Sequence, residues 1–396
     1  MTELAAQVAA DQAKAGGGRF QLDRVLTIIS GHFIHDTYSA FLAPLLPDLI
    51  EKLSLSYTQA GLLSTIMQLP SVLNPIIGYL DDKIDLRILV ILAPALSATT
   101  MSCLGLAPNY LSLAILLFIT GISITAFHAP SPAMIARVSG RQVGRGMSLY
   151  MAAGELGRTI GPLLASWGLL TFTLEGMYPV AILGWIASLV IFIRFKGVPV
   201  HVEKQPGFRA VAPIARRLFL PIIGILFFRS FLITGLGVYL PTLLEAAGAS
   251  VWKANATLAI YQLAGVFGAF LGGTVSDRLG RKPVLFTVSV FAPVMVVLFL
   301  RANGWLIIPI LIVAGLLSLS GQPILLAIVQ DQLPHHRSVG NGLFMMISFI
   351  CLSLSAVAIG FIGDRIGLQQ ALMWTAISGV VTIPFILVLP KRPILS

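Results

Sequence analysis

The stretch GGTVSDRLGRK (residues 272–282) is followed almost at once by an uncharged run, VLFTVSVFAPVMVVLFL (284–300). Another apolar run, 254–276, precedes it. A run of about 20 apolar residues is long enough to cross roughly 30 Å of hydrocarbon. The charged stretch is therefore predicted to be a tight turn between two membrane helices. Its glycines allow close helix approach, Asp277 can cap a helix N-terminus, and its basic residues hold the turn at the inner surface.

The composition of the whole chain agrees with a membrane protein. The chain has 396 residues, of which 57% are hydrophobic and only 11% are charged, with a mean hydropathy of +0.91. A soluble domain carries about 25% charged residues. The net charge of +10 is then explained by basic cytoplasmic loops, and a nucleic-acid partner is not expected. Cys103 and Cys351 lie in apolar segments and suggest no disulfide framework.

Apolar runs of similar length recur along the chain and predict an all-α membrane protein with twelve transmembrane helices. We place them near 25–47, 58–80, 88–106, 111–136, 146–170, 178–195, 219–243, 254–276, 284–301, 306–330, 339–362 and 370–389. Of the 26 Lys and Arg residues, four fall in external loops and two, Arg158 and Arg229, fall inside spans. The other 20 are cytoplasmic if the N-terminus is inside. Both termini are therefore predicted to be cytoplasmic.

Internal repetition divides the chain into two pseudo-symmetric halves of six helices. LLPDLIEK (45–52) aligns with YLPTLLEA (239–246), and VGRG (143–146) aligns with VGNG (339–342), at offsets of 194 to 196 residues. Such repeats are typical of large transporter folds, in which the substrate site lies between the halves. We predict a flexible cytoplasmic tail without a signal peptide at 1–24, a half at 25–195, a cytoplasmic linker at 196–217 and a second half at 218–396.

These motifs resemble those of the major facilitator superfamily. The pattern Gly-x-x-x-Asp-Arg-x-Gly-Arg-Lys is complete in the second half, at Gly273, Asp277, Arg278, Gly280, Arg281 and Lys282. The first half has a degraded copy, GYLDDKIDLR (78–87), which keeps Gly78, Asp82 and Lys83 but has Asp85 in place of the second glycine. The resemblance implies the major facilitator fold, and a gating role for both copies of the motif.

A narrower resemblance is to the fosmidomycin-resistance subgroup of that superfamily. It is carried by GHFIHD (31–36), FHAPS (127–131) and GELGRTIGPLL (154–164). The subgroup exports small polar drugs in exchange for protons, which implies a bacterial inner-membrane location. Gly157, Gly161 and Pro162 resemble the antiporter motif of such exporters, in which small residues permit helix contact and proline bends the helix. His35 departs from the uncharged polar residue that is common in relatives, and leaves the substrate open.

A polar stripe on the first span is the main candidate for proton coupling. On a helix that turns 100° per residue, His32, His35, Asp36 and Ser39 lie within about 100° of one another. Lipid would not solvate them, so they must face a cavity or other helices. Asp36 is predicted to take up and release protons, with His32 and His35 sharing or relaying them. The alternative is a hydrogen-bonded cluster that only positions the helix.

Ionisable residues of the other spans supply further candidates. Glu155 and Arg158 are three residues apart and can pair; Glu155 is a second candidate proton carrier, although the pair can equally be structural. Arg229 has no acidic residue within four positions, so it is expected to bind Asp36 or a substrate anion. The predicted substrate-binding residues are Arg229, Arg158, His128, its counterpart Gln322, Tyr38 and Gln262.

The leading prediction is therefore a proton-coupled antiporter that exports a small polar or anionic organic molecule. One alternative is an exporter of a metal ion or metal chelate that uses His32, Asp36 and His128, whose donor atoms suit zinc or iron. Another is a proton symporter that works as an importer. No enzymatic motif is present. A monomer in the lipid bilayer is expected, with protons and a small-molecule substrate as partners and no cofactor, resident metal or nucleic acid.

Overall fold

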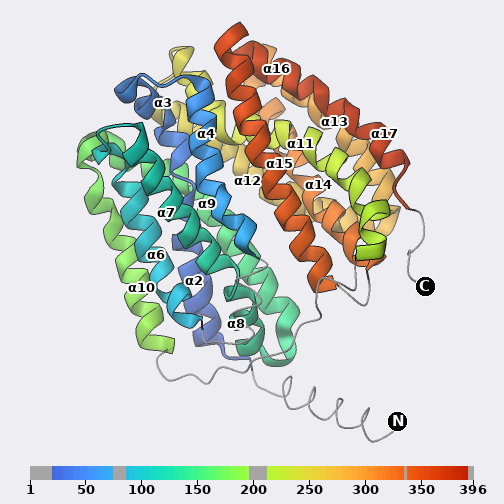
Figure 1. Cartoon of the computed structure of the whole chain (residues 1–396), viewed down its shortest axis with the longest axis horizontal. Helices are drawn as coiled ribbons and strands as arrows, with labels where there is room; N and C mark the ends of the chain where they lie inside the picture. The colour runs from blue at the N-terminus through green and yellow to red at the C-terminus, as the bar shows by residue number, and fades with distance from the viewer. Residues whose placement is uncertain (1–19, 75–85, 196–211, 334–336, 391–396) are drawn as a thin grey trace, which may run out of the picture.

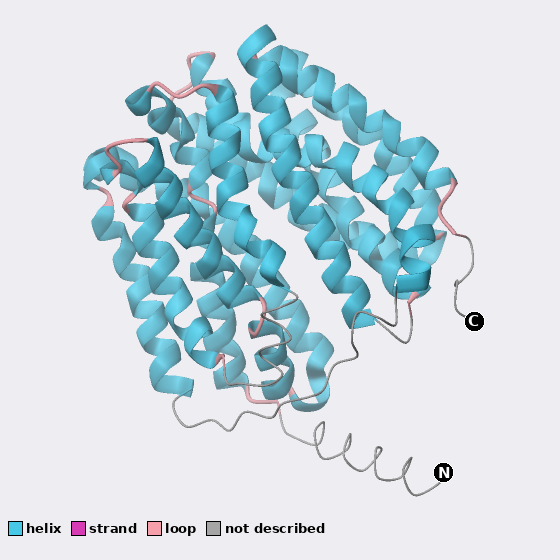
Figure 2. Ribbon diagram, viewed as in Figure 1, coloured by secondary structure: helices cyan, strands magenta, loops and turns pink. Residues whose placement is uncertain are grey.

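The computed structural model describes residues 20–74, 86–195, 212–333 and 337–390, and in these ranges it contains helices and no strands (Figures 1 and 2). The helices are α2 (Leu22–Ser39), α3 (Leu42–Leu53), α4 (Tyr57–Gln68), α6 (Arg87–Ser102), α7 (Tyr110–His128), α8 (Ser131–Val138), α9 (Val143–Gly176), α10 (Ile182–Phe195), α11 (Ala212–Ala246), α12 (Val251–Leu279), α13 (Arg281–Arg301), α14 (Ile307–Gln332), α15 (Arg337–Ile366), α16 (Leu368–Ser378) and α17 (Thr382–Leu387). The prediction of an all-α protein is confirmed.

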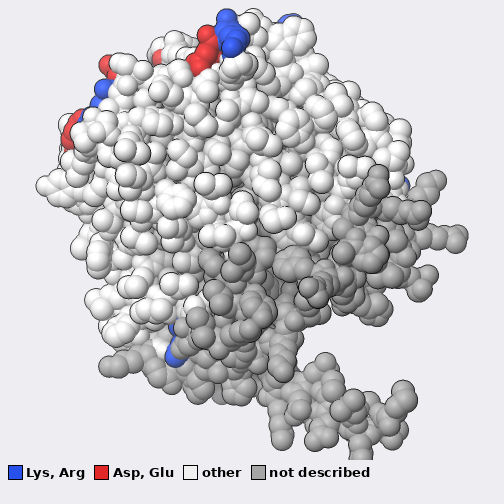
Figure 3. All heavy atoms as spheres, in the orientation of Figure 1, with Lys and Arg blue, Asp and Glu red and all other residues white. Residues whose placement is uncertain are grey.

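Eight segments of the described chain are long and apolar enough to cross a membrane, and they coincide with the predicted fourth, sixth and seventh to twelfth spans. In the described chain the helices of the other predicted spans are shorter or more polar, and residues 75–80 of the second span lie outside the described residues. The first, for example, is divided into α2 and α3 at Ala40 and Phe41. Together they are consistent with twelve crossings. The described surface in Figure 3 has a broad band without charged residues, and large side chains such as Phe270 and Ile193 are exposed to the surroundings.

The charged turn at 272–282 joins α12 to α13 through one residue, Gly280. Gly280 has φ 95° and ψ 142°, a left-handed conformation that is costly for residues with a Cβ. Arg281 pairs with Asp277, and its Nε lies 3.2 Å from Asp331 Oδ2 at the end of α14. The complete copy of the predicted gating motif therefore connects helices α12, α13 and α14. Gly78, Asp82 and Lys83 of the degraded copy lie outside the described residues, and α11 begins at Ala212, inside the predicted linker.

The helices form two bundles that lie side by side (Figure 1). Helices α2 to α10 form one bundle and helices α11 to α17 form the other. They meet where α4 packs on α15, α9 on α12 and α3 on α11. Glycines make the α4–α15 contact close, because a Cβ at Gly61 would lie 2.4 Å from Ala356 O and one at Gly360 would lie 2.1 Å from Tyr57 O.

A carboxylate locks the two bundles together at the end where α4 begins. Asp364, near the end of α15, accepts hydrogen bonds from the backbone N–H groups of Tyr57 (2.7 Å) and Thr58 (2.9 Å), and from the Thr58 hydroxyl. These are the first residues of α4, whose N–H groups have no partner within the helix and carry a partial positive charge. Asp364 thus caps a helix of the opposite bundle.

We expect Asp364→Asn to loosen this end of the molecule. A hydrogen bond to a charged group stabilises by about 1.5–3 kcal/mol, so its weakening should shift the population towards conformers in which the bundles separate here. Spin labels at the exposed positions Leu111 and Trp305, in a chain with both cysteines replaced by serine, would report a longer or broader distance distribution. Glu175→Gln is the control, because Glu175 pairs with Lys52 inside one bundle. An unchanged distribution in Asp364→Asn would contradict the capping role.

Candidate functional site

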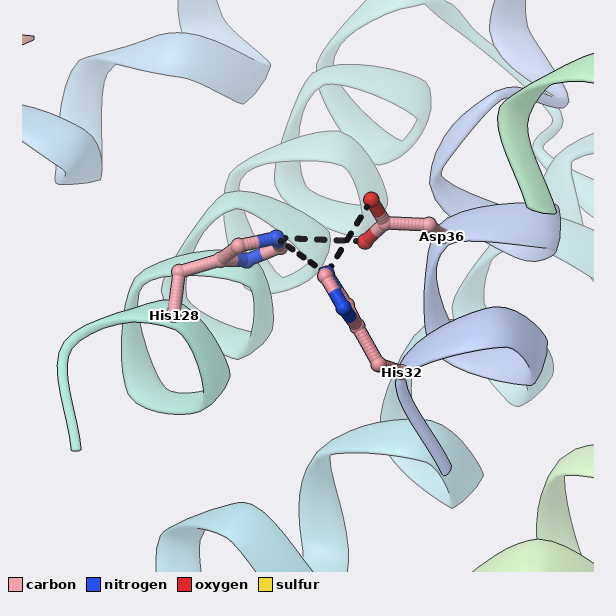
Figure 4. A group of neighbouring side chains, drawn as sticks. All are labelled: His32, Asp36 and His128. Carbon is pink, nitrogen blue, oxygen red and sulfur yellow. Dashed lines mark hydrogen bonds and ion pairs between the residues drawn. The ribbon is translucent and has the colours of Figure 1, made fainter. Parts of the chain in front are cut away.

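The centre of the candidate site is the carboxylate of Asp36, which α2 holds inside the first bundle. The residue is 1% exposed. Its Oδ2 lies 3.0 Å from Arg158 Nη1 of α9. Oδ2 also lies 3.4 Å from His32 Nε2, and Oδ1 lies 3.2 Å from His128 Nε2 of α7 (Figure 4). Three helices therefore converge on one buried charge. The Arg158 guanidinium also pairs with Glu155 through Nη2, so it links two carboxylates.

Glycines of α9 allow this convergence, because they bring α9 into direct contact with α2. A Cβ at Gly154 would lie 2.4 Å from His32 Cε1, and one at Gly157 would lie 2.4 Å from the backbone oxygen of Phe33. Gly161 continues the same face, where a Cβ would lie 2.5 Å from Thr37 O. Without these glycines the two backbones would move apart, and Arg158 would lose its reach to Asp36.

Aromatic rings fix the orientation of the histidines. The His32 ring stacks on Tyr150 with centroids 3.9 Å apart and on Phe127 at 5.5 Å. The His35 ring also stacks on Phe127, at 4.5 Å, and its Nδ1 lies 3.2 Å from Ser97 Oγ of α6. The predicted stripe is therefore split: His32 and Asp36 share one cluster, whereas His35 is directed to α6.

A cavity of about 150 Å³ lies between the two bundles, next to this cluster. Arg158 is the charged residue of its lining, and its side chain is 40% exposed. Polar lining residues come from both bundles: Ser39, Ser64, Gln68 and Gln262. Pro162, within α9, also lines the cavity. A small molecule in this space would contact Arg158 directly, and Arg158 would connect it to Asp36.

Arg229 of α11 is buried within the second bundle. It is 2% exposed, and its Nη2 donates to the Ser318 carbonyl oxygen at 2.6 Å. A separate cavity of about 10 Å³, lined in part by Gln322 and Ser348, adjoins it. Gly321 leaves the space that the guanidinium fills, since a Cβ there would lie 2.1 Å from Nη1.

Two expectations for individual contacts therefore need correction. Asp36 is paired with Arg158 of its own bundle, not with Arg229, because α9 packs along α2 while Arg229 turns towards α14. Tyr38 does not line the cavity: it is fully buried, and its hydroxyl donates to the Val180 carbonyl oxygen. His128, predicted for the substrate, is in contact with Asp36.

The cluster also contains three possible metal ligands. His32, Asp36 and His128 each offer a donor atom, and these atoms lie within 4.8 Å of one another. Two imidazoles and a carboxylate suit zinc. The Arg158 guanidinium, in contact with the same carboxylate, opposes a bare divalent cation because like charges repel at this distance. The arrangement fits a proton better than a metal ion.

The sequence analysis missed some members of the site. Tyr150 and Gly154 shape the space around His32, and Gln68 lines the cavity. Gly154 lies in the stretch GELGRTIGPLL and shares a helical face with Gly157 and Gly161, so the glycine spacing was an available indication. Nothing about Tyr150 distinguishes it from other aromatic residues of the spans.

The chain is similar to known transporters over most of its length. The family model described as Major Facilitator Superfamily matches residues 28–356. The Fosmidomycin resistance protein of Escherichia coli (strain K12) is 23% identical, with 93% of each chain covered. A Probable sugar efflux transporter of Helicobacter pylori (strain J99 / ATCC 700824) is 25% identical over 90% of this chain and 95% of its own length.

Solved transporters have the same fold. A mutant of the nucleoside transporter NupG superposes with a TM-score of 0.77 at 16% identity, over 93% of this chain and all of that chain (100%). A D-xylose-proton symporter superposes with a TM-score of 0.74 at 15% identity, over 94% of this chain and 98% of its own. At these identities the similarity establishes the fold alone.

The glycine face of α9 leads to a test of the site's construction. Gly157→Ala should destabilise the protein by about 1–3 kcal/mol, the usual cost of forcing extra atoms into a packed core, because the new Cβ would meet backbone. Gly144→Ala in the same helix meets nothing within 4 Å and should be neutral or slightly stabilising. Thermal unfolding in detergent measures both. Equal melting temperatures for the two variants would contradict the close α2–α9 contact.

Proposed function

The chain belongs to the Major Facilitator Superfamily, and on that premise we propose that it exports a small polar organic molecule in exchange for protons. The observation that carries the proposal is the contact between Asp36 and Arg158 at 3.0 Å, directly beside the cavity that Arg158 lines. The carboxylate of Asp36, whose charge a proton would remove, is thus in contact with the Arg158 guanidinium, which faces the cavity. The names of the relatives, a resistance protein and a sugar efflux transporter, support export.

Arg158 is the proposed anchor for an acidic group of the substrate. Its guanidinium is planar and can grip a carboxylate, phosphate or phosphonate with two parallel hydrogen bonds. It is 40% exposed, whereas Arg229 is 2% exposed. Gln68 and Gln262, from opposite sides of the cavity, are the proposed partners for neutral polar groups. Of the two arginines predicted to bind substrate, Arg158 is thus the proposed principal anchor, while Arg229 and Gln322 remain candidates for a second subsite.

Exchange requires that the substrate and the proton exclude each other. A simple anion on Arg158 would release Asp36 and favour a proton there, so anion and proton would bind together. A substrate that also carries a hydrogen-bond donor behaves differently, because its donor satisfies the same carboxylate cluster and takes the place of the proton. We therefore propose a zwitterionic or donor-bearing acid as the substrate. Alternation between the two bundles would then carry the substrate outwards and the proton inwards.

The location and assembly follow from the same proposal. We place the protein in a bacterial inner membrane with both termini in the cytoplasm, supported by the basic loops. The two bundles pack on each other along α4–α15 and α9–α12. Residues of both bundles in one chain line the cavity, and a monomer is the proposed unit.

Symport is the competing mode, and two observations favour it. The charged group among the described lining residues is the cation Arg158, and a simple anion bound to it would favour a proton on Asp36. In addition, a fold neighbour is a proton symporter. The pH dependence of substrate binding separates the two modes. Antiport requires affinity to rise with pH, since the proton is a competitor, and symport requires affinity to fall with pH.

We expect Asp36→Asn to uncouple transport from protons. In proteoliposomes the variant should lose uphill transport driven by a pH gradient and keep substrate exchange, because the amide remains polar but carries no charge. Glu175→Gln is the control for a carboxylate outside the site, because Glu175 pairs with Lys52. Wild-type uphill transport by Asp36→Asn would sink the proposal.

A ligand panel should separate the roles of Arg158 and Arg229. Zwitterionic and acidic ligands should bind Arg158→Gln roughly 10- to 150-fold more weakly, the equivalent of about 1.5–3 kcal/mol for a lost charged hydrogen bond. Arg158→Lys keeps the charge but loses the fork, so its loss should be intermediate. Thermal shift or calorimetry measures the binding. A larger loss in Arg229→Gln than in Arg158→Gln would return the anchor to Arg229, and a preference for cations would refute both assignments.

A further inference from the structure

The protonation of His32 and His128 can be deduced from their hydrogen-bond partners. His32 Nδ1 lies 2.8 Å from the carbonyl oxygen of Tyr150, and His128 Nδ1 lies 2.9 Å from the carbonyl oxygen of Ile124. A carbonyl oxygen can only accept a hydrogen bond. Each Nδ1 must therefore carry a hydrogen and donate it. In a neutral imidazole the other nitrogen, Nε2, then has a bare lone pair.

The two Nε2 atoms face each other and the carboxylate. They lie 3.3 Å apart, and each is 3.2–3.4 Å from an oxygen of Asp36. If both rings were neutral, two lone pairs and a carboxylate would be in mutual contact with no hydrogen between them. Acceptors buried without a donor cost free energy, and these would repel one another. One proton on either Nε2 relieves the conflict, since that nitrogen then donates to the other ring or to Asp36 and its ring carries a positive charge beside the carboxylate.

The charges around the pair set the number of protons. Asp36 and Glu155 supply two negative charges, and Arg158 supplies one positive charge. One imidazolium makes the cluster neutral. A second would place two cations 3.3 Å apart beside a guanidinium, which a poorly solvated site does not support. The other facing groups are His35, whose ring lies 5.5 Å from that of His128, and the Tyr150 hydroxyl, which bonds Ser131. Helices α6 and α10 pack on α2 through Ser97 and Ile191.

We infer that the coupling proton is shared by His32 and His128, and that Asp36 stays ionised between this pair and Arg158. The inference rests on the proposed function, in which Asp36 couples transport to protons, and it names the two side chains that hold the proton beside Asp36. His32 is 3% exposed, whereas the His128 side chain is 30% exposed. His128 is thus the member that exchanges its proton with water and meets the substrate's donor group. Loss of the proton leaves Asp36 with Arg158 as its cationic partner, which tightens that ion pair.

Nitrogen NMR of the histidines in lipid tests the shared proton directly. Replacing His201, His335 and His336 by Asn leaves His32, His35 and His128 of the six histidines. We expect one Nε2 signal of the pair to be protonated and the other bare, with a measurable coupling across the N–H···N bond, near neutral pH. Two bare or two protonated Nε2 nitrogens would overturn the inference. A signal shift on adding Zn²⁺ that chelator reverses, together with transport that requires Zn²⁺, would replace the proton by a metal ion.

Transport measurements separate this inference from the proposed function. We expect His128→Gln and His32→Gln to lose pH-driven transport while exchange persists, as in Asp36→Asn, and His201→Gln to behave as wild type. If Asp36→Asn uncouples while both histidine variants remain proton-driven, the shared proton is refuted and the proposed function stands. If wild-type protein shows no proton-driven transport, the proposed function fails. If the histidine variants do not fold, the NMR measurement on the intact pair still decides.

Discussion

The structure depends on how one carboxylate is stabilised inside the membrane. Moving an ion out of water costs several kcal/mol even after the protein relaxes, and Asp36 is 1% exposed. Its oxygens contact a guanidinium and two imidazoles from three helices. Because removing any of these partners would leave a buried charge only partly compensated, α2, α7 and α9 must keep their mutual positions. The charge therefore restrains the bundle as well as supplying its chemistry.

That restraint explains the small residues that surround the charge. Gly154, Gly157 and Gly161 form the face of α9 that touches α2, and a Cβ at any of them would lie within 2.5 Å of an α2 atom. Helices in a membrane gain little from the hydrophobic effect when they associate, so close backbone contact and polar contacts replace it. Close packing brings Arg158 to Asp36, and the ion pair in turn favours the packing. The same helix carries Pro162 to the cavity wall.

The two bundles meet on either side of the cavity, and their contacts connect the chemistry to movement. Helix α9, which carries Arg158, also packs on α12 of the other bundle. In the proposed function, a change in the charge that Arg158 balances would therefore act at the surface along which one bundle moves against the other. At the end where α4 begins, Asp364 caps a helix of the opposite bundle. In both places a carboxylate binds a positively charged group: Asp36 binds Arg158 inside one bundle, and Asp364 binds the N-terminus of α4 across the two bundles.

The sequence by itself determined the membrane class, the all-α fold and most helix positions, because a long apolar run has few alternatives in lipid. The expected 284–301 span lies within α13. Sequence also identified His32 and Asp36 as one pair, since residues four apart share a helical face. Only the tertiary structure decided which distant residue meets Asp36. The lack of an acidic residue near Arg229 in its own span suggested that Arg229 meets Asp36, but helix packing within one bundle selected Arg158 and His128 instead.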